Sequence, residues 1–226
     1  MILTLLPLMA SADDSGSCGT NVTYTYVEST HTLTISGNGA MDDYTWDNHP
    51  GWYSYRSEIV KIVIENGVTS IGNEAFNGCS LTSITIPNDV TSIGNRAFFG
   101  CNELTSVVIL GNVKSIGSGT FARCAKITDL YCHAEKVPST RRDAFNNSYV
   151  EKATLHVPAS ALEAYKTTMP WSTFGTIVSI EDEAVAISTI ADSNSPSGHV
   201  CNLQGQRLSS TRRGLFIRDG KKYVVK

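Results

Sequence analysis

The sequence predicts a mainly β to α/β fold, a solenoid in which about five coils of 22–25 residues stack on one another. The first observation is a period. The pattern of Leu81–Cys101 recurs 22 residues earlier and 23 residues later, with its Ile, Val, Phe and Cys in register. The second is the spacing inside one copy, where Ile84 and Ile86 lie two residues apart and therefore share one face of an extended strand. Stacking is expected because no single copy can bury its apolar face alone.

Residues 1–12 are expected to be a secretory signal peptide. An apolar run from Ile2 to Met9 is followed by the small-x-small cleavage pattern Ala10-Ser11-Ala12, although no basic residue comes before the run. An ordinary N-terminal strand is the alternative for this segment. The run is too short to cross a bilayer, so no transmembrane segment is expected here.

Residues 13–58 are expected to form a non-repetitive N-terminal β cap on the first coil. Asn21–Val27 and Thr32–Ser36 alternate between apolar and polar side chains, which predicts two strands. An uncovered strand edge would invite pairing between molecules, so a cap at this place has a structural purpose.

Residues 59–180 hold the repeats and a C-terminal cap. Within one copy, Val90 and Ile93 are expected to point into the coil, and Gly94 is expected to adopt a backbone conformation that a side chain would resist. Ala97 and Phe98 then sit on a short helical or 3₁₀ turn. In the stack, the repeated Ile, Val and Phe become continuous internal ladders.

The cysteines predict buried thiols rather than a disulfide framework. A cysteine recurs at one repeat position, and parallel Cβ vectors in adjacent coils are unsuited to bridging. Whether Cys18 and Cys201, in the outer segments, are paired is left open. The cysteines expected to be buried are Cys79, Cys101, Cys124 and Cys132.

The array is expected to end in a short helix. Ala161–Lys166 is amphipathic, with Leu162 and Tyr165 on one side, and the apolar Trp171 and Phe174 follow. Residues 181–199 are rich in Ala, Ser, Asp and Asn and are expected to be a linker.

The repeats resemble the BspA-like leucine-rich repeats, in which a strand reading I-x-I-P is followed by V-x-S-I-G-x-x-A-F-x-G-C. Ile84-Thr85-Ile86-Pro87 and Val90–Cys101 carry the resemblance, which extends from Ile59 to Trp171. It implies a non-catalytic, secreted or surface protein of host-associated bacteria that takes part in adhesion and protein binding.

Residues 200–226 predict a small separate β module of three short strands, with a hairpin turn at Asp219-Gly220. Asn202-Leu203-Gln204-Gly205 and the closing Gly220-Lys221-Lys222 resemble a C-terminal segment related to the sorting domains of type IX secretion. The resemblance implies an export or attachment signal, and with it a secreted or outer-membrane-associated protein.

The composition excludes several function classes. A net charge of −3 and 17% charged residues argue against a nucleic-acid partner. The histidines are scattered, and no H-E-x-x-H, G-x-S-x-G or phosphate-binding loop occurs, so an enzyme is not expected. No C-x₂₋₄-C pair occurs, and neither a metal nor a cofactor is expected.

Two candidate binding surfaces follow. The first is the row of outward strand positions, because solenoids bind partners across such extended faces; a solvated face without a ligand is the alternative. The second is the aromatic passage Asp42–Tyr53, where Trp46 and Trp52 either form a binding patch for sugar or protein or seal the first coil. The candidate residues of the first surface are Lys61, Thr85, Val108, Asp129, Tyr131, Thr154 and His156.

Three functions therefore remain open. The favoured one is an adhesin-like protein that binds a host or matrix protein through the exposed solenoid face. The alternatives are a structural or envelope protein without a high-affinity ligand, and a carbohydrate-binding protein that uses Trp46 and Trp52.

Overall fold

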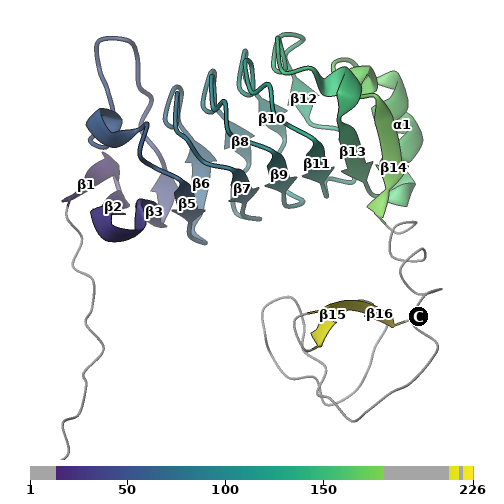
Figure 1. The fold of residues 1–226 in the computed structure, drawn as a ribbon, viewed down its shortest axis with the longest axis horizontal. Coiled ribbons are helices and arrows are strands. Elements are labelled where there is room, and N and C mark those ends of the chain that lie inside the picture. Colours follow the sequence, from purple (N-terminus) through teal and green to yellow (C-terminus); the bar gives the residue numbers. More distant parts are fainter. Residues whose placement is uncertain (1–13, 181–213, 219–220, 226) are drawn as a thin grey trace, which may run out of the picture.

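Repeats stacked with their strands parallel dominate the structure, a computed structural model that describes residues 14–180 and the two strands at 214–218 and 221–225 (Figure 1). One parallel sheet takes a longer strand from each repeat. Ile84 pairs with Val107 and Val107 pairs with Leu130, so each pairing joins one repeat to the next. In spatial order the strands of this sheet are β7 (Ser83–Ile86), β9 (Ser106–Ile109), β11 (Asp129–Cys132), β13 (Thr154–Val157) and β14 (Thr176–Ser179).

A second parallel sheet, which the sequence did not predict, takes a further strand from each repeat. All of its strands but one have only two residues, too few to show an alternation of apolar and polar residues. Ile93 lies in register between Ile71 and Ile116, and all three are buried. In spatial order the strands are β4 (Gly39–Ala40), β6 (Val68–Ile71), β8 (Ser92–Ile93), β10 (Ser115–Ile116) and β12 (Ser139–Thr140).

The core is a set of internal ladders between the two sheets. Ile84, Ile86, Val90 and Ile93 are at most 2% exposed, which confirms the inward positions predicted for this copy. One of the ladders is aromatic, with ring centroids 5.3 to 5.8 Å apart between neighbours. Its members are Trp52, Phe76, Phe98, Phe121 and Phe145.

The chain at Ala97–Phe98 forms a turn rather than the expected helical or 3₁₀ segment. The N–H of Phe98 donates to the carbonyl of Thr120 in the next repeat at 2.9 Å. The N–H of Phe76 donates to Ala97 in the same way at 2.8 Å. Because these donors bond between repeats, they are not available for a local helix.

The repeated cysteines are buried free thiols, as predicted. Cys101 Sγ donates to the carbonyl of Phe76 at 3.3 Å, and Cys124 Sγ donates to that of Phe98 at 3.1 Å. Burial raises the pKa of Cys79 to about 12. Cys18 is likewise buried and free, with its pKa raised to about 12 by burial and by the charge of Asp42.

The N-terminal segment is an antiparallel sheet of β1 (Asp14–Gly19), β2 (Val22–Val27) and β3 (Thr32–Gly37). β2 and β3 were predicted; β1 was not, because its Ser- and Gly-rich sequence carries no apolar alternation. β3 pairs in parallel with β5 (Lys61–Ile64), which lies beside β7 (Figure 1). β4 pairs with β6, so β3 and β4 already occupy repeat-strand positions within a segment expected to be non-repetitive. Short 3₁₀ turns follow β2 and β4, namely η1 (Glu28–Thr30) and η2 (Tyr53–Tyr55).

At the other end of the stack, the expected short helix is present as α1 (Leu162–Thr167). Tyr165 is fully buried, and its hydroxyl donates to the carbonyl of Ala134 at 3.1 Å. Trp171 and Phe174 are buried against Phe145, which extends the aromatic ladder beyond the last repeat. The 3₁₀ turns of this region are η3 (Val150–Lys152), η4 (Ala159–Ala161) and η5 (Trp171–Thr173).

Two of the three strands predicted in the C-terminal module are present. β15 (Gly214–Arg218) and β16 (Lys221–Val225) are antiparallel, and Arg218 pairs with Lys221. The third predicted strand, the signal peptide and the linker all lie outside the described residues.

Replacement of Phe98 by Ala is expected to destabilise the protein by about 3–5 kcal/mol, because a fully buried ring in the middle of the ladder is lost. Urea denaturation of the wild-type and variant proteins measures the loss. Phe99→Ala is the matched control, since Phe99 is only partly buried and lies outside the ladder. Equal losses for the two variants would contradict the assignment of Phe98 to the core.

The native protein is expected to resist alkylation by iodoacetamide at Cys79, Cys101 and Cys124. The thiolate is the reactive form, and burial raises the pKa of Cys79 to about 12 and that of Cys101 well above its ordinary value. Peptide mass spectrometry at about pH 8, with and without denaturant, measures the protection. Modification at the same rate in both conditions would show that the thiols are not held in the core.

Candidate functional site

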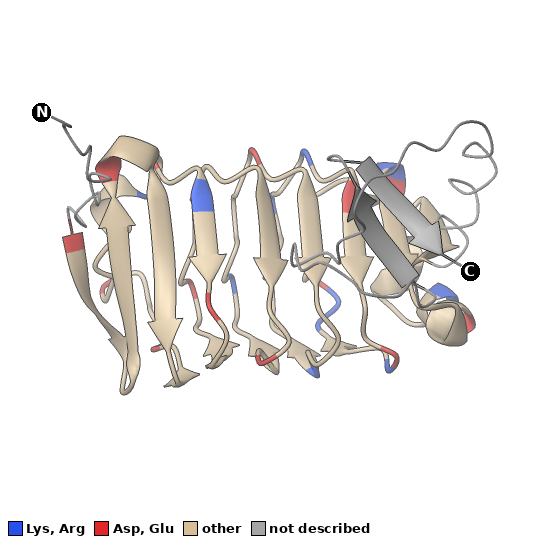
Figure 2. Cartoon of the chain, turned by 90° about the horizontal axis from the view of Figure 1, so that it is seen from below, with Lys and Arg blue, Asp and Glu red and all other residues tan. Residues whose placement is uncertain are grey.

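The outward side chains of the longer strands form one continuous surface, here called the strand face. Thr85, Val108 and Tyr131 lie in register across β7, β9 and β11, and Lys61 lies on the neighbouring β5. Figure 2 shows that acidic and basic residues gather mainly in turns and at strand ends, so this face carries few charges.

Six of the seven predicted strand-face residues are accessible to some degree. Lys61 and Thr85 are exposed. The partly buried ones are Val108, Asp129, Tyr131 and Thr154.

His156 is the exception, because it is only 4% exposed although its position points outward. Its ring stacks on that of Tyr131 with 4.0 Å between centroids, and its Nε2 lies 3.0 Å from Asp129 Oδ1. The expectation that His156 is accessible to a ligand is therefore wrong. Its contacts instead hold Tyr131 and Asp129 in position.

The predicted patch of Trp46 and Trp52 does not exist as a surface. Trp52 is fully buried, stacks on Phe76, and donates from Nε1 to the carbonyl of Ala75 at 2.9 Å. It takes the place that Phe holds in the later repeats. Trp46, by contrast, is 81% exposed and does not seal the first repeat. The two side chains therefore have separate environments, and neither interpretation holds for both.

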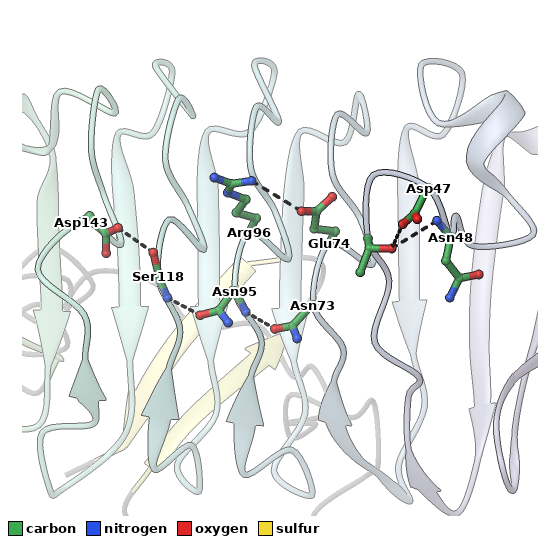
Figure 3. Close-up of polar contacts among 9 residues, drawn as sticks. Asp47, Asn48, Asn73, Glu74, Asn95, Arg96, Ser118 and Asp143 are labelled. Atoms are coloured by element: carbon green, nitrogen blue, oxygen red, sulfur yellow. Dashed lines mark hydrogen bonds and ion pairs between the residues drawn. The ribbon is translucent and has the colours of Figure 1, made fainter.

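A polar ladder runs along the second sheet, and the sequence analysis missed it (Figure 3). Asn73 Oδ1 accepts the backbone N–H of Asn95 at 2.6 Å, and Asn95 Oδ1 accepts that of Ser118 at 2.7 Å. Asp43 begins the ladder by accepting from the N–H of Asn73 at 2.8 Å, and Ser118 Oγ donates to Asp143 at 2.6 Å. We call these five residues the asparagine ladder. The available signal was a polar residue directly after the Gly of each Ile-Gly pair, at positions 73, 95 and 118.

Gly94 is required for this ladder, but not for the reason expected. It does not have a positive φ; a Cβ there would instead lie 2.6 Å from the backbone nitrogen of Asn73. Gly117 stands in the same relation to Asn95, also at 2.6 Å. The glycine therefore allows close approach between repeats rather than a special conformation.

A groove of about 1000 Å³ runs along the asparagine ladder. Glu74 and Arg96 face each other across one repeat, with 3.6 Å between Oε1 and Nη1 (Figure 3). The hydrogen bond from Ser118 lowers the pKa of Asp143 below its ordinary value, so this carboxyl is an anion at neutral pH. The groove is lined by Tyr44, Thr45, Asn73, Glu74, Asn95, Arg96, Ser118, Thr140, Arg141, Arg142 and Asp143.

The described part of the chain contains no cluster of three or more His, Cys, Asp or Glu side chains placed to bind a metal ion. Among the same residues, no helix has the length and apolar composition that a membrane crossing requires.

Gly94→Ala is expected to destabilise the protein by about 1–3 kcal/mol, because the added methyl group has no space against Asn73. Gly111→Ala is the matched control, since the nearest atoms to its added Cβ lie 3.7 Å away and its φ is not in the left-handed region. Thermal and urea denaturation measure both. A Gly94→Ala protein as stable as the control would contradict the close approach between repeats.

Comparison with known proteins agrees with this architecture. Residues 51–166 match the family described as BspA type Leucine rich repeat region (6 copies). A leucine-rich repeat protein from Eubacterium ventriosum is 24% identical, with a TM-score of 0.52 over 66% of this chain and 45% of that one, which shows a similar fold. The chain thus spans about half the length of that structure.

A leucine-rich cell surface protein from Faecalibacterium prausnitzii is 18% identical over 71% of this chain and 64% of its own, but its TM-score of 0.23 is too low to support a structural argument. No curated protein matches the chain. The family match covers just over half of the sequence and the repeats that it describes are those of the two parallel sheets. The chain belongs to the BspA type leucine-rich repeat family.

Proposed function

We propose that this is an exported, non-catalytic protein of the bacterial cell surface, adhesin-like, which binds a host or matrix protein through the strand face. Membership of a leucine-rich repeat family supports a role in protein interaction. The observation that carries the proposal is the register of Thr85, Val108 and Tyr131, which turns separate strands into one uninterrupted surface. Extended surfaces of this kind are how stacked-repeat proteins bind partners.

The chemistry of the strand face suits a protein more than a small charged ligand. Val63 and Val108 supply apolar area, and the half-buried Tyr131 supplies an aromatic anchor held by His156. Centres of protein interfaces are poor in charge and rich in Tyr. Lys61, near one margin, is suited to the polar rim.

The proposal includes a solenoid with a cap at each end. The β1–β3 sheet would serve as the cap at one end, and α1 with the buried Trp171 as the cap at the other. Residues 1–12 would direct export, and residues 200–226 would serve sorting or attachment to the outer membrane.

Thr85→Arg is expected to weaken binding to a matrix protein at least about tenfold, because a long charged side chain would stand in the middle of the interface. The full chain and the variant are assayed by surface plasmon resonance against fibronectin, laminin, fibrinogen and collagen. The variant should remain as stable as the wild type, since Thr85 is exposed.

Asn102→Arg is the matched control, because Asn102 is exposed in a turn and not in a strand of the strand face, and the charge change is the same. If both variants bind like the wild type, the strand face is not the site. If the wild-type protein binds none of the four proteins, a structural role without a high-affinity ligand becomes the better account.

A further inference from the structure

The groove along the asparagine ladder is a second surface, separate from the strand face. Its lining comes from Thr140 of β12, from the turns after β6, β8, β10 and β12, and from Tyr44 and Thr45, whereas the strand face belongs to the longer strands. Tyr44 and Thr45 stand at one end of the groove, and Arg141 and Arg142 at the other. The proposed binding of a protein by the strand face does not involve this groove, so the groove is free to bind a second ligand.

The groove presents two equivalent hydrogen-bond donors, one repeat apart. The Oδ1 atoms of Asn73 and Asn95 are occupied by backbone N–H groups of the next repeat (Figure 3). The Nδ2 group of each amide is therefore the part left to meet a ligand. Neighbouring repeats are about 4.8 Å apart, so these donors recur at the step of the strands. Two equivalent donors at this spacing fit a ligand that places similar units side by side.

The charges of the groove favour an anionic ligand. Its lining has three guanidinium groups and two carboxylates in a chain whose net charge is −3. Glu74 is paired with Arg96, and Asp143 remains an anion that accepts a hydrogen bond from Ser118, so the three guanidinium groups leave the lining with a net charge of +1. Arg141 and Arg142 are exposed and lie where the earlier repeats carry Gly94 and Asn95. Basic side chains thus replace small or neutral ones at the end of the groove.

Two groove residues have a backbone conformation that glycine adopts more easily. Glu74 and Arg96 have φ values of 54° and 53°, and the next copy places Gly119 at the same position with φ of 58°. The ion pair between Glu74 and Arg96 is solvent-accessible and adds little to stability. Residues held in sparsely populated conformations are characteristic of binding sites. The two side chains face the groove from these positions.

An extended peptide fits this geometry poorly. Peptides that add to a sheet pair with a strand edge, whereas the ladder runs across the strands from repeat to repeat. A peptide also brings its own N–H donors, and each Asn oxygen already accepts one backbone N–H, which leaves it one lone pair. Sugar hydroxyls and carboxylates can accept from amide and guanidinium groups without that mismatch.

We propose that the groove along the asparagine ladder binds a short carboxylate-bearing oligosaccharide. The Nδ2 groups of Asn73 and Asn95 donate to hydroxyl oxygens of successive sugar units, and Arg96, Arg141 and Arg142 bind the carboxylates.

The test uses the full chain and two probes, tetragalacturonic acid and a hyaluronan hexasaccharide, in isothermal titration calorimetry. For each probe, the affinity of the acidic sugar is compared with that of its carboxyl-reduced, neutral counterpart. At least one acidic probe should bind saturably and at least about tenfold more tightly than its neutral counterpart, which is a difference of about 1.4 kcal/mol. Absence of binding by both acidic probes would overturn the proposal.

Asn95→Asp is the most informative variant, because it keeps the Oδ1 acceptor for Ser118 while replacing a donor by a carboxylate. It should fold normally and lose at least tenfold in affinity for the acidic probe. Asn112→Asp is the matched control, since Asn112 is exposed outside the groove and the charge change is identical. Equal affinities for the two variants would remove the groove from consideration.

Arg96→Gly separates binding from folding. It should keep or raise Tm, because Gly tolerates the left-handed conformation, and yet weaken the acidic probe severalfold. Hexaglutamate is measured beside the sugars. Binding of this peptide as tightly as the acidic sugars, with the same sensitivity to Asn95→Asp, would identify an acidic peptide as the ligand class instead. Thr85→Arg should leave sugar binding unchanged, so failure here and failure of the strand-face proposal are distinguishable.

Discussion

Backbone hydrogen bonds between neighbouring repeats are the interaction on which the rest of the structure depends. The longer strands pair from repeat to repeat, and even the turn at the aromatic position donates outward, as Phe76 does to Ala97 at 2.8 Å. A single repeat would therefore leave its polar backbone groups unpaired as well as its apolar side chains exposed. The free energy of folding lies largely in the interfaces between repeats.

The same constraint makes each position of the repeat pack against its own copy. A Phe meets a Phe in the aromatic ladder, a cysteine lies one step from a cysteine, and an Asn side chain bonds the backbone of the next Asn. A residue type that packs well against a copy of itself can recur at one repeat position. A residue type that does not pack well in this way is excluded from that position in every repeat. Gly94 and Gly117 illustrate the strictest case, since a Cβ at either place would collide with the backbone of the preceding repeat.

The sequence predicted what depends on the period and missed what depends on neighbours outside it. Inward positions such as Ile84 follow from spacing, and the buried thiols follow from recurrence at one position. The sequence could not tell that Trp52 is buried and Trp46 exposed, because only the stacked structure shows that Trp52 occupies the place that Phe holds in the later repeats. His156 points outward as expected. Its burial depends on the side chains that surround its ring, including Tyr131, and the alternation of residues along a strand does not predict such neighbours. The asparagine ladder was visible as a recurrence, yet its role depends on a hydrogen bond between repeats.

In a stack of this kind, some positions of the repeat determine stability and other positions are available for binding. Inward positions are constrained by self-packing, whereas the strand face and the groove use side chains that the core does not need. Glu74 and Arg96 make the point most clearly, because Gly119 shows that the fold accepts glycine at their position. Their side chains cost conformational strain and contribute a solvent-accessible ion pair and the contact of Arg96 with the Phe99 ring, both of which add little to stability. What they add is charge at the margin of a polar groove, so their presence is explained better by the chemistry of that groove than by the requirements of the fold.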